Sequence, residues 1–149
     1  MKLSMKPFLV ASVLTVFTGV TLAQDGQPTP EERAYKFRTS LFQTFAWKLG
    51  QMAGAKSQDD KEAFVQHAKD LSYLSTMIEE GFKIKDSLPD GTKAKPAIWE
   101  DYPKFQEKVA VMAEITNGFT NADAMADFDP REFGSKACGS CHRDFRIKD

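Results

Sequence analysis

Both cysteines of the chain lie within four residues of each other, and a histidine directly follows the second. They stand in the stretch KACGSCHRDFR as Cys138, Cys141 and His142. This C-x-x-C-H spacing is typical of covalent attachment of a c-type haem. On a helix the three side chains share one face, because positions i, i+3 and i+4 are neighbours. The two thiols can then bond the two vinyl groups of one porphyrin edge while the imidazole binds the iron.

Three other uses of this motif fit the sequence less well. A disulfide between Cys138 and Cys141 would close a very short loop and constrain little. A thioredoxin-like C-x-x-C lies where a strand enters a helix, whereas this motif lies two turns into the last expected helix. A structural zinc site needs a further ligand, and the remaining histidine, His67, is far away in sequence. The motif therefore predicts one covalent haem c per chain.

The composition is that of one globular domain with a core of ordinary size. The chain has 149 residues, of which 42% are hydrophobic and 28% charged. Its formal net charge of −1 gives no electrostatic attraction to nucleic acid. No phosphate-binding loop or Gly-rich dinucleotide turn is present in the sequence. We therefore expect no nucleic-acid partner.

The first residues have the order of a secretory signal peptide. Lys2 and Lys6 precede an uncharged apolar run that ends with small residues at Ala23. The alternative is an uncleaved membrane anchor, but the run is a little short of the ~20 apolar residues that a membrane span needs. We expect residues 1–23 to be cleaved, which leaves a mildly acidic domain of residues 24–149 in the periplasm, without a membrane segment.

Capping signals and apolar spacing predict four helices and no strand. The first helix begins at Pro30, where Thr29 is a suitable N-cap and Glu32 completes a capping box, and it is expected to stop near Gly54. The second begins near Ser57. The buried faces of these two helices should carry Ala34, Leu41, Phe45, Leu49 and Met52, and then Phe64, Ala68, Leu71, Ile78 and Phe82.

The third and fourth helices follow a polar connection that is expected to run as a loop through Ile98 and Trp99. The third helix begins around Asp101, and the fourth begins at Pro130, where Asp129 and Glu132 predict a second capping box. Four amphipathic helices with mostly short connections predict an all-α fold. We expect an antiparallel four-helix bundle with the haem bound by the C-terminal helix.

One stripe of the first helix combines an arginine with apolar residues. Arg38, Phe42, Phe45 and Leu49 fall at i, i+4, i+7 and i+11. Because a buried unpaired charge is costly, Arg38 needs a partner, and a haem propionate is one candidate. The alternative is that Arg38 extends along the bundle edge to solvent. The spacing leaves both open.

The remaining histidine and the methionines are not expected to bind iron. His67 has the polar neighbours Gln66 and Lys69 and is predicted to lie on the surface of its helix. Three methionines occur at core spacing and are expected to pack in the interior: Met52, Met77 and Met112.

The mature chain resembles the cytochrome c′ family, the high-spin group of class II c-type cytochromes. Its members are four-helix bundles with the haem motif near the C-terminus. The resemblance covers nearly all of residues 30–148, and three stretches carry it: AYKFRTSLF, KPAIWEDYPKF and CGSCHRDFR. The position of the motif is informative, because most other cytochromes c carry it near the N-terminus.

The resemblance implies a role for each site residue. Cys138 and Cys141 would form the thioethers to the haem, and His142 would bind the iron. Arg38 would contact a haem propionate, as the pairing of charges favours. Arg146 corresponds to an arginine on the side of the haem where the histidine binds.

Phe42 departs from the family pattern. It falls where members usually place an aliphatic residue, often leucine, over the free face of the iron, and Phe45 follows on the same stripe. Six-coordinate relatives have a methionine near this place, but this chain has none between Met5 and Met52. The resemblance therefore implies a five-coordinate haem in a crowded apolar pocket that favours NO and, more weakly, CO. A phenyl group here could slow ligand entry or direct ligands to the other face.

Two main functions follow from the resemblance. The chain would bind NO or CO reversibly, transfer single electrons to or from a periplasmic partner, or do both. The alternative is a six-coordinate, low-spin class II cytochrome that acts purely as an electron carrier. An enzyme such as a peroxidase is not expected, because no distal histidine, arginine or acid is evident to assist peroxide cleavage. The resemblance also implies a homodimer through the first two helices.

Overall fold

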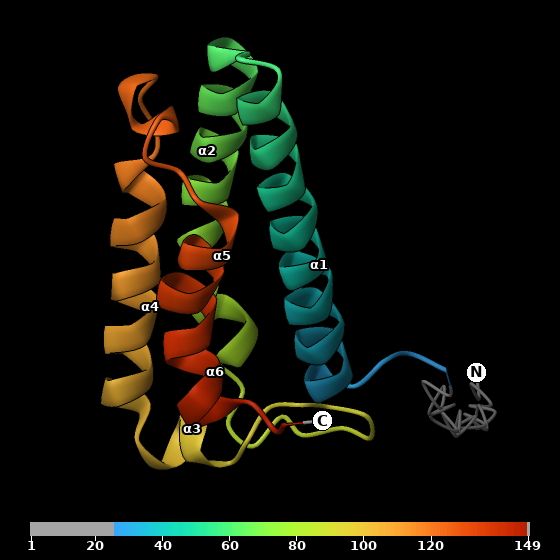
Figure 1. Cartoon of the computed structure of the whole chain (residues 1–149). Helices are drawn as coiled ribbons and strands as arrows, with labels where there is room; N and C mark the ends of the chain where they lie inside the picture. Colours follow the sequence, from blue (N-terminus) through green and yellow to red (C-terminus); the bar gives the residue numbers. More distant parts are fainter. Residues whose placement is uncertain (1–25, 149) are drawn as a thin grey trace, which may run out of the picture.

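The computed structural model describes residues 26–148, so the expected signal peptide lies outside the described residues. These residues form a four-helix bundle, as the sequence predicts (Figure 1). Three of its helices are α1 (Pro30–Ser57), α2 (Lys61–Ser75) and α4 (Tyr102–Gly118). The fourth is a composite of α5 (Pro130–Phe133), a π-helical segment (Gly134–Cys138) and α6 (Gly139–Phe145). No helix within residues 26–148 is long and apolar enough to cross a bilayer.

The start of α1 confirms the predicted capping box. The Thr29 hydroxyl accepts a bond from the Glu32 amide at 3.2 Å, and the Glu32 carboxylate accepts one from the Thr29 amide at 2.7 Å. The predicted stop at Gly54 is wrong, because α1 continues to Ser57. The chain turns instead at Asp59, which has a φ of 52°. Aspartate tolerates this left-handed conformation better than most residues.

The second helix is shorter than predicted at both ends. It begins at Lys61, where Asp60 is the N-cap, and it ends at Ser75. The chain then forms a 3₁₀ turn (Glu79–Phe82) four residues after the end of α2. A Cβ atom on Gly81 would lie 2.8 Å from the Cβ of Arg38, so the chain passes α1 at a distance that only glycine permits. The predicted buried face is confirmed, since all five of its members are buried: Phe64, Ala68, Leu71, Ile78 and Phe82.

A short helix lies where the sequence predicted a loop. This helix, α3 (Ala97–Glu100), precedes α4 and buries Ile98. The indole nitrogen of Trp99 donates to the Phe82 carbonyl at 2.8 Å, which holds α3 against the 3₁₀ turn. The predicted start of α4 is confirmed, since the Asp101 side chain accepts from the Lys104 amide.

The last helix begins at the predicted residue, but its first turn and its middle differ from the prediction. Asp129 accepts bonds from the amides of Arg131 and Glu132, both at 2.8 Å. The predicted second capping box does not form, because the Glu132 carboxylate pairs with Lys136 one turn later. The predicted continuous α-helix is interrupted by the π-helical segment.

The π-helical segment keeps one series of side chains on the inner face of the last helix. Phe133, Ala137, Cys141 and Phe145 recur every four residues and all face the interior or the cavity described below. In a regular α-helix with 3.6 residues per turn, such a series would rotate by about 120° between its first and last members. The wider π turn absorbs most of this rotation. The haem-type motif therefore begins on the same face as the buried Phe133.

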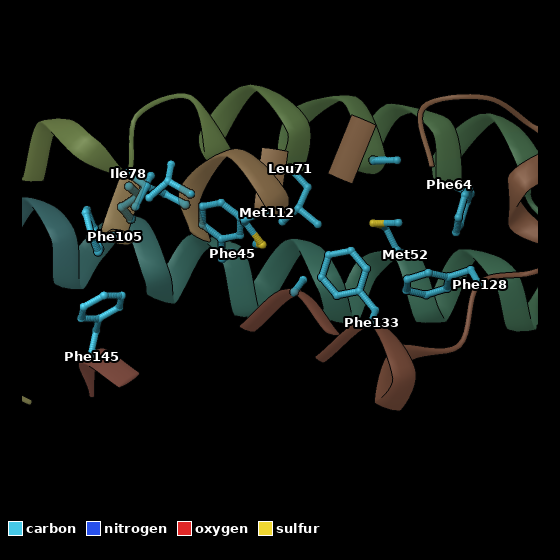
Figure 2. Close-up of a cluster of buried hydrophobic side chains, with 14 of the residues drawn as sticks. Phe45, Met52, Phe64, Leu71, Ile78, Phe105, Met112, Phe128, Phe133 and Phe145 are labelled. Carbon is cyan, nitrogen blue, oxygen red and sulfur yellow. The ribbon is translucent and has the colours of Figure 1, made fainter. Parts of the chain in front are cut away.

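The hydrophobic core runs along the bundle axis between the helices (Figure 2). At one end the rings of Phe64 and Phe128 pack edge to face, with their centroids 5.3 Å apart. At the other end Phe105 and Phe145 pack in the same manner at 5.6 Å. Phe145 belongs to α6, so the second pair joins the motif-bearing helix to α4.

Candidate haem site

A cavity of about 690 Å³ lies between α1, α4 and the last helix. Its size falls in the range of pockets that hold a cofactor or another small molecule. Its walls come from α1, the end of α2 and the 3₁₀ turn, residues 91–94, α4 and the last helix, and they are mostly apolar. All seven residues that the sequence singled out line it together: Arg38, Phe42, Phe45, Cys138, Cys141, His142 and Arg146.

The two cysteines have the properties of protected thiols. They are half-buried and unbonded to each other. Burial raises the pKa of Cys138, and it raises the pKa of Cys141 to about 11. Both groups are therefore protonated at neutral pH, whereas a thioredoxin-like pair needs a lowered pKa to form the reactive thiolate. This environment argues against disulfide exchange as their function.

A zinc site is also excluded within the described part of the chain. No group of three or more His, Cys, Asp or Glu side chains in residues 26–148 could hold a metal ion. The motif thus supplies one histidine and two thiols to the cavity wall, without further protein ligands around them. This donor set matches the covalent haem that the spacing predicts.

His142 borders the cavity from α6. Partial burial lowers the pKa of its imidazole, and the nearby charge of Arg146 lowers this pKa further. The ring is therefore neutral at neutral pH. A neutral imidazole is the form in which a ring nitrogen can bind a metal.

Arg38 is buried, with 4% of its surface exposed. Its guanidinium donates to the Gly81 carbonyl at 3.3 Å, to the Ser87 hydroxyl at 2.7 Å and to the Thr92 hydroxyl at 3.2 Å, and also to the Ser87 carbonyl. The alternative that Arg38 extends to solvent is therefore wrong. Its polar partners come instead from the 3₁₀ turn, at Gly81, and from the connection between this turn and α3, at Ser87 and Thr92.

The partners of Arg38 are all neutral. In residues 26–148 no carboxylate lies within ion-pair distance of its guanidinium. The guanidinium carbon lies 5.4 Å from the ring centre of Tyr35 and 5.1 Å from that of Phe82, which adds cation–π contacts. Burial lowers the pKa of Arg38, but arginine keeps its charge in proteins. A buried cation with only neutral partners at a cavity wall suits an anionic group on a bound cofactor.

The α1 wall of the cavity is aromatic. Phe42 packs on Phe45 and Phe82 with ring centroids 6.0 Å and 6.5 Å away, and 37% of its surface is exposed. Leu49 lies further along the same stripe, and it also lines the cavity. The four-member stripe read from the sequence therefore forms one wall, with the arginine beside three apolar residues.

Several lining residues were not singled out by the sequence. Thr39 and Gln43 follow Arg38 and Phe42 directly, so they flank the same stripe, and a wider stripe would have included them. Lys93 and Lys108 carry no periodic signal, because they reach the cavity from a loop and from another helix. Met112 was predicted to pack in the core; it is buried as predicted, but it also borders the cavity.

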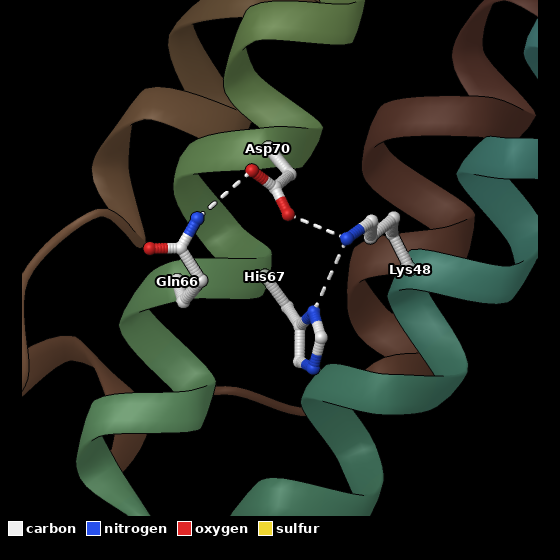
Figure 3. A network of polar contacts seen from close by, with 4 residues as sticks. All are labelled: Lys48, Gln66, His67 and Asp70. Carbon is white, nitrogen blue, oxygen red and sulfur yellow. Dashed lines mark hydrogen bonds and ion pairs between the residues drawn. The ribbon is translucent and has the colours of Figure 1, made fainter.

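His67 is not among the residues that line the cavity, and it is half-buried rather than on the surface as predicted. It belongs to a polar network between α1 and α2 (Figure 3). The Lys48 amine lies 3.4 Å from Nδ1 of His67 and pairs with Asp70, which also accepts a bond from Gln66. Since the amine can only donate, Nδ1 accepts. The bond from Lys48 lowers the pKa of Asp70.

Comparison with known proteins agrees with this site. The sequence model of the family described as Cytochrome C' matches residues 33–146. This chain belongs to the cytochrome c′ family. It is thus a class II c-type cytochrome, and the family binds haem c. The resemblance read from the three sequence stretches is confirmed.

Individual relatives extend over most of this cytochrome. A cytochrome c-554 from Cereibacter sphaeroides is 32% identical over 86% of this chain and 88% of its own length. A solved cytochrome c' from Rhodobacter Spheriodes is 26% identical, with a TM-score of 0.64 over 81% of this chain and all of the other. A nitric oxide complex of a mutant cytochrome c prime from Alcaligenes xylosoxidans shares the fold, at 21% identity and a TM-score of 0.63 over 82% of this chain and all of the other.

The contacts of Arg38 predict the effect of removing its charge. In the Arg38→Met variant α1 loses its bonds to Gly81 in the 3₁₀ turn and to Ser87 and Thr92 in the connection from 83 to 96. We therefore expect the free energy of unfolding to fall by about 2–4 kcal/mol. Denaturant titration measures the fall, and hydrogen exchange should become faster in residues 83–96. The control is Lys36→Met, an exposed cation on the same helix. Unchanged exchange in residues 83–96 would contradict this role of Arg38.

Proposed function

We propose that this cytochrome is exported to the periplasm and holds one haem c covalently through Cys138 and Cys141. His142 binds the iron, and the protein transfers single electrons, binds NO reversibly, or does both. One observation carries the proposal: a single cavity is lined at once by the C-x-x-C-H motif and, on another helix, by a buried arginine without an acidic partner. The bound haem supplies the redox-active iron and one free coordination position.

The polar residues of the cavity would serve two purposes: some attach the haem and bind its iron, and Arg38 pairs with a propionate. Cys138 and Cys141 are neutral thiols in a half-buried wall, and this state suits thioether formation with vinyl groups. The neutral ring of His142 is ready to bind iron. Arg38 pairs with a propionate while it keeps its bonds to the loop, because a guanidinium has five N–H donors. Arg146 lies on the same side as His142, whose pKa it lowers.

Phe42 lines the cavity on the α1 side and would cover the free face of the iron in the bound haem. The apolar wall of Phe42, Phe45 and Leu49 favours a small ligand that needs no hydrogen bond, namely NO or, more weakly, CO. Among the described residues that line the cavity, none is Asp or Glu and His142 is the sole histidine. A peroxidase would need such a group opposite the iron-binding histidine. The nitric oxide complex of the structural relative adds support for a gas ligand.

The proposal includes export and a second copy. Residues 1–23 carry the charged, apolar and small-residue order of a signal peptide, and haem attachment follows in the periplasm. In a homodimer, α1 and α2 of each copy form the contact. These helices expose the large side chains of Trp47, with 57% of its surface accessible, and Tyr73, with 65%.

The mass of the exported protein tests attachment and cleavage together. When the full chain is produced with a periplasmic c-type haem attachment system, we expect the denatured protein to have the mass of residues 24–149 plus one haem. Cys138→Ala and Cys141→Ala should each leave at most one thioether, and the double variant should lose the haem on denaturation. Haem released from the unfolded wild-type protein would contradict covalent attachment.

Optical spectra test the coordination of the iron. We expect a high-spin spectrum in the oxidised and reduced protein, and a shift when NO is added to the reduced form, because no ligand from α1 occupies the free face. A low-spin spectrum that NO does not change would favour the pure electron carrier. Met112, the methionine at the cavity wall, would then be the ligand to test with Met112→Leu.

The position of Phe42 predicts a change of spin state. In Phe42→Met a thioether replaces the ring over the free face, so we expect conversion to a low-spin, six-coordinate iron in the optical spectrum. The matched control is Phe37→Met on the same helix: Phe37 is also 37% exposed but does not line the cavity. If both variants remain high-spin, Phe42 does not lie over the iron.

A further inference from the structure

Four cations gather around one acid on the surface beside Cys141. We define this basic surface by Lys95, Lys104, Lys108 and Arg143, with Asp144 at its centre. Lys104 pairs with the Asp144 carboxylate at 3.2 Å, and the Lys95 amine lies 3.2 Å from the Asp144 carbonyl and 3.4 Å from that of Arg143. Arg143 directly precedes Asp144 in the chain, and Lys108 lies one helical turn after Lys104 on α4. A single carboxylate thus faces an excess of positive charge.

The basic surface borders the cavity wall where the haem edge would be attached. Lys108 lines the cavity together with Cys141. The Lys104 amine lies 6.0 Å from the ring centre of Phe145, which also lines the cavity. Positive charge therefore lies beside the cavity wall that holds Cys141, the cysteine that would carry one edge of the haem.

The basic surface is open to a partner. Arg143 is exposed, and the side chains of Lys104 and Asp144 are 49% and 34% exposed. Within residues 26–148 no carboxylate lies within ion-pair distance of Lys95, Lys108 or Arg143. Of the four cations, Lys104 alone is therefore neutralised by an ion pair in this part of the chain.

The rest of the domain has the opposite charge. The lower end of the bundle in Figure 1, made of residues 26–41, 79–108 and 139–148, contains twelve Lys and Arg against ten Asp and Glu, a net charge of +2. Residues 42–78 and 109–138 contain six Lys and Arg against nine Asp and Glu, a net charge of −3. Such a separation orients an approaching charged protein, because long-range fields steer diffusional encounters.

We propose that the basic surface is the docking site for the acidic face of a redox protein, which exchanges one electron with the haem through the edge at Cys141. The proposal rests on the proposed haem site and names the partner class for its electron transfer. One electron leaves the donor and reduces Fe(III) to Fe(II), and no bond is made or broken. The net negative charge of the domain disfavours binding to an anionic membrane, whereas an acidic protein face can match the local positive charge.

Stopped-flow reduction of the ferric holoprotein by reduced flavodoxin, an acidic electron carrier, tests the docking site. The variant Lys104→Glu/Arg143→Glu reverses two exposed charges of the basic surface, and neither of these residues lines the cavity. The control is Lys61→Glu/Lys69→Glu, which makes the same change in net charge on α2. We expect the first variant to be reduced about tenfold more slowly at low ionic strength, as steering effects predict, and the control to be slowed less than twofold.

Salt and the choice of reductant separate the outcomes. The difference between the variants should vanish at high salt, and the neutral variant Lys104→Gln/Arg143→Gln should be intermediate at low salt. Equal slowing of both charge-reversed variants, or no slowing of either, would overturn the docking site. Binding of the wild-type protein to anionic phospholipid vesicles would also overturn it, if Lys104→Glu/Arg143→Glu abolishes that binding. Failure of dithionite to reduce the wild-type haem, by contrast, would refute the proposed electron transfer itself.

Discussion

The buried cation of Arg38 organises the part of the protein that surrounds the cavity. It joins α1 to the 3₁₀ turn at Gly81 and to Ser87 and Thr92 in the following connection. That connection then pairs with the last helix, since the Lys95 amide donates to the Phe145 carbonyl and the Ile147 amide donates to the Lys93 carbonyl. One side chain thus links the apolar stripe of α1 to the end of the helix that bears the haem motif.

The neutral groups and the charged groups of the site lie in different places. Burial keeps the two thiols protonated, and burial with the charge of Arg146 keeps His142 neutral. The cations lie at the edges of the cavity, where the negatively charged groups of a cofactor or a protein partner can reach them. An apolar interior strengthens each of these interactions, because a low dielectric constant weakens the screening of charge.

Aromatic packing gives the cavity firm walls. Phe42, Phe45, Phe82 and Phe105 are joined by ring contacts, and Phe105 contacts Phe145 in α6. A bound cofactor therefore meets side chains that neighbouring rings hold in place. Phe42 is the member of this group with the most exposed surface, at 37%. It is the wall residue with the most freedom to adapt to a ligand.

The sequence by itself was enough to predict the features that depend on residues close together in the chain, such as helix starts and helix faces. The helix starts at Thr29, Asp101 and Asp129 were predicted correctly, because a cap is a bond between a side chain and an amide two or three residues away. The C-x-x-C-H motif and the stripe from Arg38 to Leu49 were equally readable, since helical spacing sets which side chains share a face. The cytochrome c′ family followed from three short stretches.

Features that depend on residues far apart in the chain could be known only from the tertiary structure. The partners of Arg38, Ser87 and Thr92, lie 49 and 54 residues further along the chain. Gly81, beyond the early end of α2, passes α1 at a distance that only glycine permits. The π-helical segment lets a series that repeats every four residues face one cavity. No local pattern in the sequence predicted these features, since each involves segments that meet only when the bundle is packed.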